Sequence, residues 1–319
     1  MAARPNPVTA RRCGAQLLSG PRAPNPTAVA ARLLAVQAQD PRGFRLAVRA
    51  RTTGVTAADV DGALADRSLL VTWLNRGTLH LVTAEDYWWL HALTTPPIRP
   101  ANARRLAQTG VSPDAADRAV RIVARSLADD GPLTGEELRS RLEAANVPTA
   151  GQALVHILVR ASLDGLVVRG PVRAGTQAYV LVEDWLGTGV PCDRQVALAE
   201  LARRYLVGHG PATDRDLAVW AGLTLGAART GLRAIAPQLV ELAGGLVDLA
   251  GRAVETSVPA PLLLGPFDPL LHGWRDRRAI LGDDHTVVTT NGIFRPILLA
   301  GGQAVATWGL SGGAVRLRP

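Results

Sequence analysis

The feature that most constrains the fold is a short pattern that occurs three times along the chain, beginning at Gly54, Gly131 and Gly210. In each copy a threonine, an acidic residue and an aliphatic residue follow the glycine in that order. A threonine just before a helix can accept a backbone N–H, and an acidic residue in the first turn opposes the positive end of the helix dipole. Each copy therefore predicts a helix start, and the recurrence predicts a repeated structural unit.

The sequence after the second copy indicates what this unit is. A helical pattern over 152–163 is followed by two strand-like segments, 165–169 and 179–182, with a glycine-bearing link between them. Helix, helix and hairpin in this order make a winged helix, whose second helix commonly enters a DNA groove. The third copy repeats the order more weakly, with helical patterns over 214–222 and 227–236 and a hairpin turning at Gly244-Gly245.

The first copy is followed by a hairpin of its own. Strand-like segments over 69–74 and 78–82 flank a turn at Asn75-Arg76-Gly77, which reads as the wing. Alternation along the second strand puts its two leucines on one face, so His80 points away from the core if the leucines are buried. Thr83 is then expected to cap the helix that follows.

From about Pro259 the chain becomes rich in predicted strands, and the segments 293–300 and 303–310 form a hairpin around Gly301-Gly302. The predicted fold class is α+β, mainly α, with three tandem winged-helix units and a small C-terminal antiparallel β-rich domain. The expected boundaries are 1–125 for the N-terminal region with the first winged helix, 126–190 for the second, 191–255 for the third and 256–319 for the β-rich domain.

Composition favours a nucleic-acid partner modestly. The chain has 319 residues, 47% hydrophobic and 19% charged, which is typical of a globular protein. The net charge is +8, and every basic residue is arginine. Codon usage in a GC-rich genome would produce such a bias, but arginine also binds phosphate bidentately.

Cys13 and Cys192 are the only cysteines, and neither lies in a metal-ligand spacing. We therefore expect free thiols, no metal and no cofactor. The sequence shows no signal-peptide core and no apolar run of membrane-spanning length, so a cytoplasmic, nucleoid-associated protein is expected.

Several strings line up, in the same order, with one known family. The strings are Gln37-Ala38-Gln39-Asp40-Pro41, Arg76-Gly77-Thr78-Leu79-His80, Leu163-Asp164-Gly165-Leu166-Val167, His209-Gly210-Pro211-Ala212-Thr213, Phe267-Asp268, Arg275-Asp276-Arg277 and Asn291-Gly292-Ile293-Phe294. With these strings the chain resembles the winged-helix DNA glycosylases typified by the azinomycin self-resistance enzyme, from about Gln37 to Trp308. That resemblance implies three winged helices and a β-rich end in a C-shape around a basic channel, and excision of N7-alkylated guanine, including unhooking of interstrand crosslinks.

In the family a pair of residues separated by one, Gln-x-Gln or Gln-x-Asp, carries the chemistry, so Gln37 and Gln39 inherit the catalytic assignment. The residues 27–36 read as a helix, and Pro41 disfavours helical geometry at Asp40. Two residues separated by one lie about 200° apart on a helix but on the same side of an extended segment. The helix must therefore stop before the pair if both amides are to serve one site.

Glutamine fits a cationic substrate. Hydrolysis of an ordinary glycosidic bond needs an acid and a carboxylate, and glutamine supplies neither charge. An N7-alkylguanine already carries a positive charge, so it leaves as a neutral base without a general acid. Glutamine carbonyls can then orient a water and stabilise the developing positive charge.

Other residues are candidate DNA contacts, each with a plain structural alternative. Arg76 can be a solvated turn arginine, Trp73 core packing and His80 a strand histidine satisfied by its neighbours. Arg275-Asp276-Arg277-Arg278 is a phosphate clamp or an ion-paired surface loop, and Asn291-Gly292 a contact or only a β-turn. The candidate DNA-binding set is Arg42, Arg45, Trp73, Arg76, Thr78, His80, Arg275, Arg277 and Asn291.

The expected partner is double-stranded DNA bearing alkylated guanine, bound by a monomer that acts as a monofunctional glycosylase. The rival interpretations are a non-enzymatic transcription regulator or architectural DNA-binding protein, and a protein-binding scaffold. Release of a base from alkylated DNA separates the enzyme from both.

Overall fold

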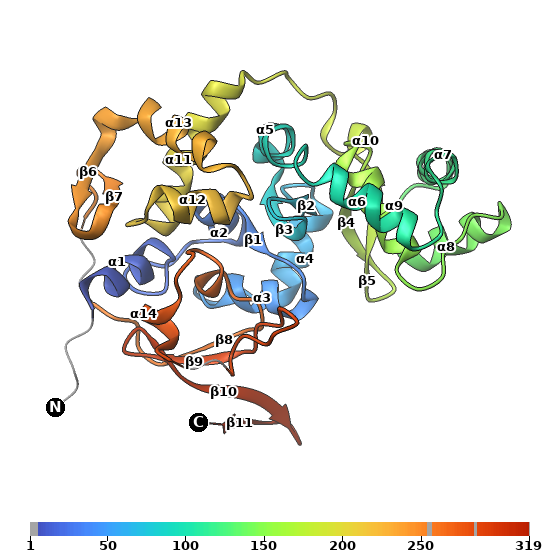
Figure 1. Cartoon of the computed structure of the whole chain (residues 1–319). Coiled ribbons are helices and arrows are strands. Elements are labelled where there is room, and N and C mark those ends of the chain that lie inside the picture. The colour runs from blue at the N-terminus through green and yellow to red at the C-terminus, as the bar shows by residue number, and fades with distance from the viewer. Residues whose placement is uncertain (1–5, 254–256, 284–285, 319) are drawn as a thin grey trace. The chain divides into compact units, whose positions relative to one another are not determined.

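The computed structural model describes residues 6–253, 257–283 and 286–318 (Figure 1). The chain forms two compact units. The first combines the residues up to Val60 with those from Asp193 onward, and the second is Asp61–Cys192. The four-part division expected from the sequence stays a prediction, because two units of this size do not test its boundaries.

The second unit is built on two β-hairpins that join into one antiparallel sheet in the order β3-β2-β4-β5. Both hairpins were expected. The turn of the first holds Asn75 at φ 53° and Gly77 at φ 78°, a conformation that asparagine and glycine adopt at little cost. The strands are β2 (Leu69–Leu74), β3 (Thr78–Thr83), β4 (Val167–Arg173) and β5 (Thr176–Leu181).

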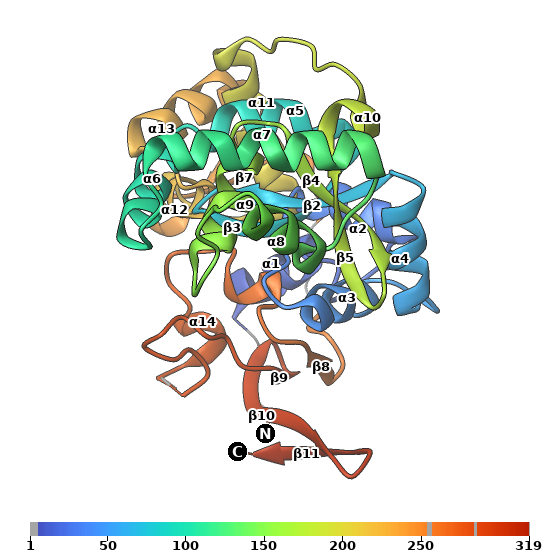
Figure 2. The same cartoon turned by 90° about the vertical axis from the view of Figure 1, so that its right-hand side faces the viewer.

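Helices pack on this sheet and on one another. Figure 2 shows α7 as a long helix, and it contacts α8, α9 and β5. Helix α8 begins with the predicted threonine cap, since the Thr134 hydroxyl accepts from Glu137 N and the Glu137 carboxylate accepts from Thr134 N. The helices are α5 (Ala84–Thr94), α6 (Arg99–Gln108), α7 (Pro113–Asp130), α8 (Gly135–Ala144), α9 (Ala153–Leu163) and α10 (Val182–Leu186), preceded by α4 (Ala57–Ala65) at the boundary of the units.

The first unit packs around α11 (Arg194–His209), which contacts α1 (Pro7–Ala15), α2 (Pro26–Leu33) and α13 (Leu225–Ala234). Close approach depends on a missing side chain at Gly208, because a Cβ there would lie 2.5 Å from the Arg32 carbonyl oxygen. The remaining elements before the C-terminal region are β1 (Val36–Gln37), α3 (Pro41–Arg49), α12 (Asp214–Ala221), β6 (Leu239–Leu242) and β7 (Leu246–Leu249), with 3-10 turns over Ala236–Gln238 and Ala243–Gly245.

The third copy of the repeat has the predicted order of helix, helix and hairpin in α12, α13 and β6–β7. Thr213 and Asp216 form the same reciprocal cap as in the second copy. Helix α12 ends at Ala221, because Gly222 after it adopts a left-handed φ of 68°. The threonine of the first copy, Thr56, likewise pairs with Asp59. All three helix starts are therefore confirmed.

The C-terminal part holds the predicted antiparallel sheet, in the order β11-β10-β9-β8. Its central turn is confirmed, since Gly301 and Gly302 both have positive φ, 60° and 83°. The strand before the turn begins at Ile297 rather than at Ile293. The elements are β8 (Leu262–Leu264), a 3-10 turn (Pro269–Leu271), α14 (Arg278–Leu281), β9 (Ile297–Ala300), β10 (Gln303–Ser311) and β11 (Ala314–Arg318). The class expected from the sequence, mainly α with antiparallel sheets, is confirmed.

Candidate functional site

The glutamine segment lies in an extended link between two helices of the first unit. Helix α2 stops at Leu33 because Leu34 adopts φ 65°, which is incompatible with a continuing helix. The sequence predicts a helix through Val36 that ends near Gln37–Gln39, so the observed end is at least three residues earlier. The link closes at Asp40, whose carboxylate accepts from Gly43 N at 2.6 Å and caps α3, with Pro41 as its first residue. The predicted condition that the pair lie outside a helix is therefore met.

The two glutamines differ in their surroundings. Gln37 belongs to strand β1 and is 4% exposed, and Ala38 beside it is 3% exposed. Gln39 is exposed to solvent. An exposed amide next to a buried one can meet a macromolecular substrate while the buried one is held in place by the protein. Convergence of both amides on one base stays a prediction.

Helix α3, directly after the pair, carries two of the candidate arginines. Arg42 lies in the first turn and is exposed. Arg45 is half-buried, because its guanidinium donates to the Pro41 carbonyl oxygen at 2.5 Å and lies 4.5 Å from the centre of the Phe44 ring. Arg42 is thus the better placed of the two for a phosphate.

His80 contradicts the expectation that it points away from the core, because only 3% of it is exposed. Helices α5 and α9 both pack against β2, so side chains on both faces of the hairpin are buried. The ring Nδ1 donates to the Thr78 carbonyl oxygen at 2.9 Å, since a carbonyl can only accept. Burial, reinforced by the charge of Arg76, lowers the pKa of His80 to about 3. His80 is a neutral, packed imidazole.

The other candidate residues of this hairpin differ in exposure, from an arginine at the surface to a tryptophan in the core. Arg76 is exposed at the turn, as predicted for a wing tip, and Thr78 is half-buried. Trp73 is 5% exposed, with the ring of Tyr179 stacked at 6.5 Å between centroids and the guanidinium of Arg169 at 4.8 Å. Core packing describes Trp73 better than base stacking.

The arginine cluster near α14 (Arg278–Leu281) is part ion pair and part open surface. Arg278 and Asp276 form an exposed pair at 2.5 Å. Arg277 donates from Nε to the Leu271 carbonyl oxygen at 2.6 Å and lies over a phenylalanine ring. The backbone of Arg275 is fixed by Asp216 at 2.9 Å, and its side chain is exposed. Arg275 thus fits a phosphate contact better than Arg277 does.

Asn291 is exposed in a tight turn, in which Gly292 N donates to the Thr289 carbonyl oxygen at 2.9 Å and Gly292 has φ 73°. The alternative interpretation of Asn291-Gly292 as only a β-turn therefore accounts for these two residues.

Two other strings of the resemblance are structural, which the sequence did not indicate. Asp268 receives both Nη atoms of Arg51, at 2.9 and 2.8 Å, and both side chains are fully buried. Gln16 accepts from Arg51 at 3.0 Å and donates to the Gly208 carbonyl oxygen at 3.1 Å. This group, here called the Arg51 clasp, joins α1, α3, α11 and the C-terminal region. Arg51 and Asp268 are 217 residues apart in the sequence, so no local sequence pattern predicts their contact.

His209, the first residue of another string, is fully buried in an aromatic cluster. Its ring stacks on Tyr205 at 4.8 Å and lies near Trp220 and Trp274. Burial lowers its pKa to about 3. Trp274 donates from Nε1 to the His209 carbonyl oxygen at 2.9 Å. The string holds the core of the first unit together.

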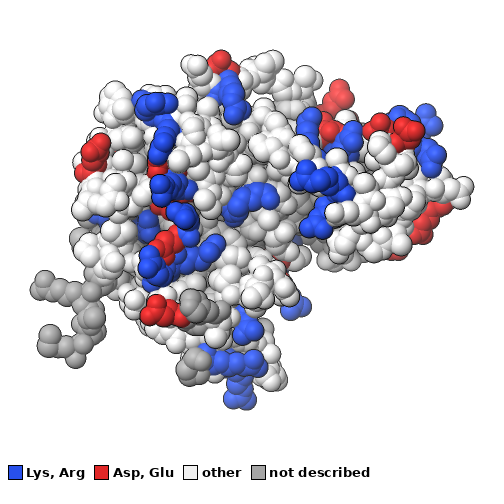
Figure 3. All heavy atoms as spheres, viewed as in Figure 1, with Lys and Arg blue, Asp and Glu red and all other residues white. Residues whose placement is uncertain are grey.

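Figure 3 shows arginine side chains gathered in a column over the face of the first unit where α13, α12 and α1 lie in Figure 1, with acidic side chains among them. Among the described residues, no group of three or more His, Cys, Asp or Glu side chains is placed to hold a metal ion. No helix in the described ranges is long and apolar enough to cross a membrane.

Comparisons with known proteins agree with this picture. The family described as DNA glycosylase AlkZ-like matches residues 30–319. A protein of Streptomyces sahachiroi named "Interstrand DNA cross-link repair glycosylase" is 28% identical over 330 residues, which cover 94% of this chain and 86% of the relative. The solved structure of the DNA glycosylase AlkZ from the same organism has a TM-score of 0.80 and 26% identity, and the match covers 98% of this chain and 89% of that one.

The mainly α fold and the family match over residues 30–319 together place the chain in a DNA-repair class of protein. The chain belongs to the AlkZ-like DNA glycosylase family, and it is a DNA glycosylase. Its substrate is DNA, and this result favours the enzyme over the rival interpretations as a regulator or a scaffold.

Proposed function

We propose that this enzyme hydrolyses the N-glycosidic bond of cationic N7-alkylguanine in double-stranded DNA and that Gln37 and Gln39 act in that step. The observation that carries the proposal is the extended Gln37-Ala38-Gln39 link, held between the end of α2 and the Asp40 cap of α3. Because the relative is named for interstrand crosslink repair, we extend the proposal to the unhooking of such crosslinks.

The chemistry of the link suits this substrate. Alkylation at N7 puts a positive charge on the base, so the C1′–N9 bond breaks with the electron pair moving to the base, which leaves neutral. The sugar then carries oxocarbenium character, which amide oxygens can stabilise while one of them holds the attacking water. The water adds its oxygen to C1′ and gives up a proton to solvent, and the products are an abasic site and the free base.

The pair's unequal exposure gives the two residues different roles in this proposal. Gln39, exposed, meets the sugar and the water, and Gln37, 4% exposed, fixes the link from within the protein and presents an amide oxygen at its edge. The exposed Arg42 and Arg275 then contact phosphates of the DNA. Arg76 at its hairpin turn is a further phosphate contact in the same proposal.

The test measures abasic sites in a duplex that carries N7-methylguanine, with no metal or nucleotide added. Gln39→Ala should lower the rate of base release by about 100-fold or more, as expected for the loss of a group that stabilises transition-state charge, while DNA binding is retained. Gln37→Met keeps the side-chain volume and removes the amide, so a loss of rate with an unchanged melting temperature separates chemistry from folding.

Gln195→Ala is the matched control, because Gln195 is an exposed glutamine on α11 of the same unit. It should leave the rate unchanged. Full turnover in both the Gln39→Ala and Gln37→Met variants would overturn the site assignment. Absence of base release by the wild-type protein from alkylated and crosslinked duplexes would overturn the substrate assignment.

We also propose that the enzyme works as a monomer on chromosomal DNA in the cytoplasm. Light scattering of the purified protein should give the mass of one chain, 33.6 kDa. A dimer mass at micromolar concentration would contradict this.

A further inference from the structure

The first unit contains a cavity of about 610 Å³ that is separate from the glutamine link. Its wall is formed by α1 and the residues after it, by Arg32 of α2, and by the β6–β7 hairpin with the residues that follow. A volume between about 300 and 1,000 Å³ is typical of small-molecule sites. Each lining residue belongs to the first unit.

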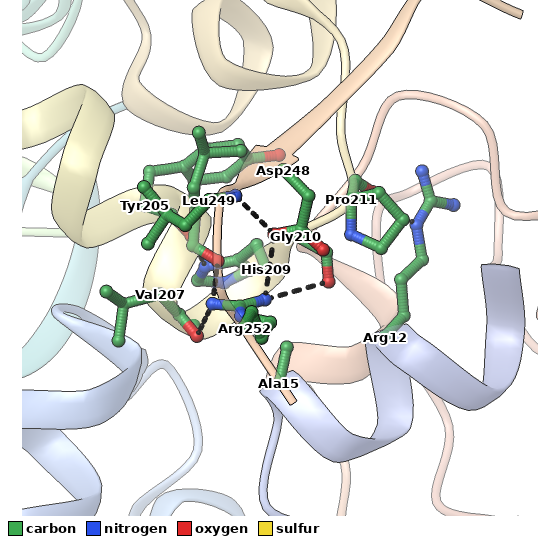
Figure 4. A network of polar contacts seen from close by, with 12 residues as sticks. Arg12, Ala15, Tyr205, Val207, His209, Gly210, Pro211, Asp248, Leu249 and Arg252 are labelled. Atoms are coloured by element: carbon green, nitrogen blue, oxygen red, sulfur yellow. Dashed lines mark hydrogen bonds and ion pairs between the residues drawn. The ribbon is translucent and has the colours of Figure 1, made fainter. Parts of the chain in front are cut away.

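One side of the cavity wall is formed by the ion pair of Arg252 and Asp248, whose opposite charges compensate each other. Arg252 donates to the carbonyl oxygens of Leu206 and Val207 at 2.6 and 2.7 Å and pairs with Asp248 at 3.1 Å (Figure 4). Asp248 also accepts from Leu249 N at 2.9 Å. The charge of the buried carboxylate is therefore compensated within the wall, and Arg252 is a structural residue.

Two other arginines, Arg11 and Arg32, bring positive charge to the same cavity. Asp248 interacts electrostatically with both, but its close ion pair is with Arg252, so the three arginines of the wall face a single carboxylate and the wall keeps a net positive charge. Arg32 donates from Nε to the Ala15 carbonyl oxygen at 3.0 Å, which leaves the donors of its terminal nitrogens for a ligand. Burial lowers the pKa of Arg32, an effect that an anionic ligand would reverse.

A buried hydroxyl in the same wall lacks a partner. Ser19 lines the cavity and is 6% exposed, and its Oγ has no hydrogen-bond partner among the described residues. A buried donor left unpaired is costly to stability, so such groups are rare in folded proteins. Rotation of the Ser19 side chain about its Cα–Cβ bond would let a ligand oxygen in the cavity accept from this hydroxyl.

The remaining lining is apolar and includes Leu17, Pro21, Val240 and Leu242. The cavity thus combines two guanidinium groups and an unpartnered hydroxyl in its wall with an apolar surface large enough for an aromatic ring. Guanidinium groups bind phosphate through paired N–H donors, and apolar side chains accept the face of a nucleobase.

We propose that this cavity binds a phosphate-bearing nucleotide, with its phosphate on Arg11, Arg32 and Ser19 and its base on the apolar residues of the hairpin. The nucleotide is either free or part of a DNA strand, and the chemistry of recognition is the same in both cases. The inference does not depend on the catalytic role of Gln37 and Gln39.

Calorimetric titration of the full chain with deoxyguanosine monophosphate tests the proposal, with deoxyguanosine and inorganic phosphate as partial ligands. The nucleotide should bind at least about tenfold more tightly than either part. Arg11→Gln and Arg32→Gln should each weaken binding about tenfold or more, as expected for the loss of a charge-assisted hydrogen bond. Arg233→Gln, which changes an exposed arginine of α13 outside the cavity, should leave binding unchanged.

Ser19→Ala separates binding from folding. It removes the unpartnered hydroxyl, so the melting temperature should stay the same or rise while nucleotide affinity falls. Competition by an unmodified duplex would identify a DNA strand as the source of the nucleotide, and absence of competition would identify a free nucleotide. Failure of the wild-type protein to bind the monophosphate, or equal affinity in the Arg11→Gln, Arg32→Gln double variant, would overturn the proposal. Because base release is not measured, this result is independent of the proposed glycosylase chemistry.

Discussion

Replacing Asp268 with alanine should be among the most destabilising single changes in the first unit. The substitution leaves the Arg51 guanidinium fully buried, with two N–H groups that have lost their acceptors and a charge without a counterion. The Nε atom of Arg51 already lacks a hydrogen-bond partner among the described residues. Only Gln16 and the Ala47 carbonyl oxygen, within the described part of the chain, remain to accept from the group.

The size of the expected loss of stability follows from the burial of the Arg51–Asp268 pair. Removing one partner of a buried ion pair costs about 3–5 kcal/mol, out of a total stability of about 5–15 kcal/mol for a domain. At roughly 2–4 °C per kcal/mol for a unit of this size, the melting temperature should fall by about 6–20 °C. Asp268 also accepts from Leu270 N at 2.9 Å, so about 1 kcal/mol of the loss is a lost cap.

Urea unfolding followed by tryptophan fluorescence measures this change, because Trp220 and Trp274 lie in the same unit. The double variant Arg51→Met, Asp268→Leu removes both charges and should recover most of the loss, apart from the cap. Asp276→Ala breaks only an exposed ion pair and should change stability by less than about 1 kcal/mol. A loss below about 1 kcal/mol for Asp268→Ala, or a double variant as unstable as the single one, would refute the reasoning.

Buried groups elsewhere in the chain give three further predictions. Burial lowers the pKa of His80 and of His209 from 6.5 to about 3. Between about pH 6.5 and 3 the unfolded chain therefore binds more protons than the folded one. The free energy of unfolding, measured by urea titration, should fall as the pH drops from about 6.5 toward 3. A thiol reagent should modify only the exposed Cys192 in the native protein, because Cys13 is fully buried and burial raises its pKa to about 12, and both thiols should react in urea. Gly208→Ala should destabilise the protein by about 1–3 kcal/mol, measured by thermal unfolding, because the new Cβ would lie 2.5 Å from a backbone oxygen.

Each of these has a matched control. His209→Gln should flatten the pH dependence, and an unchanged slope would contradict the assignment of a buried neutral imidazole. Rapid loss of both thiols in the native protein would contradict the burial of Cys13. Gly226→Ala places a methyl group in a helix with its nearest neighbour 3.9 Å away, so it should be neutral or stabilising, and equal effects at both glycines would contradict the packing argument.

The parts of the fold that depend on local chemistry were predictable from the sequence. Thr134 and Thr213 form caps with residues only three positions away, and Gly301-Gly302 sets a hairpin turn by its own backbone freedom. The helix stop before Gln37 was predictable in kind, because Pro41 restricts Asp40, but its place at Leu33 was not.

What could not be predicted depends on residues distant in the sequence. The burial of His80 depends on helices that cover both faces of its hairpin, whereas the alternation of apolar residues allowed for only one covered face. Asp268 pairs with Arg51, which lies 217 residues away in the sequence. The cavity near Ser19 is formed by α1, α2 and the β6–β7 hairpin. Such sites exist only once the elements have packed.

The position of the glutamine link is itself a product of that packing. Helix α2 is held against α11 where Gly208 meets Arg32, and the carbonyl of Gly208 accepts from Gln16, which belongs to the Arg51 clasp. The chain leaves α2 at Leu33, one residue after Arg32, and reaches Gln37 four residues later. The clasp variant Asp268→Ala should therefore reduce the rate of base release by displacing Gln37, even under conditions where the protein stays folded. Because displacement shifts the pair and does not remove its amides, the loss should be smaller than that of Gln39→Ala, and the two effects should not add in the double variant.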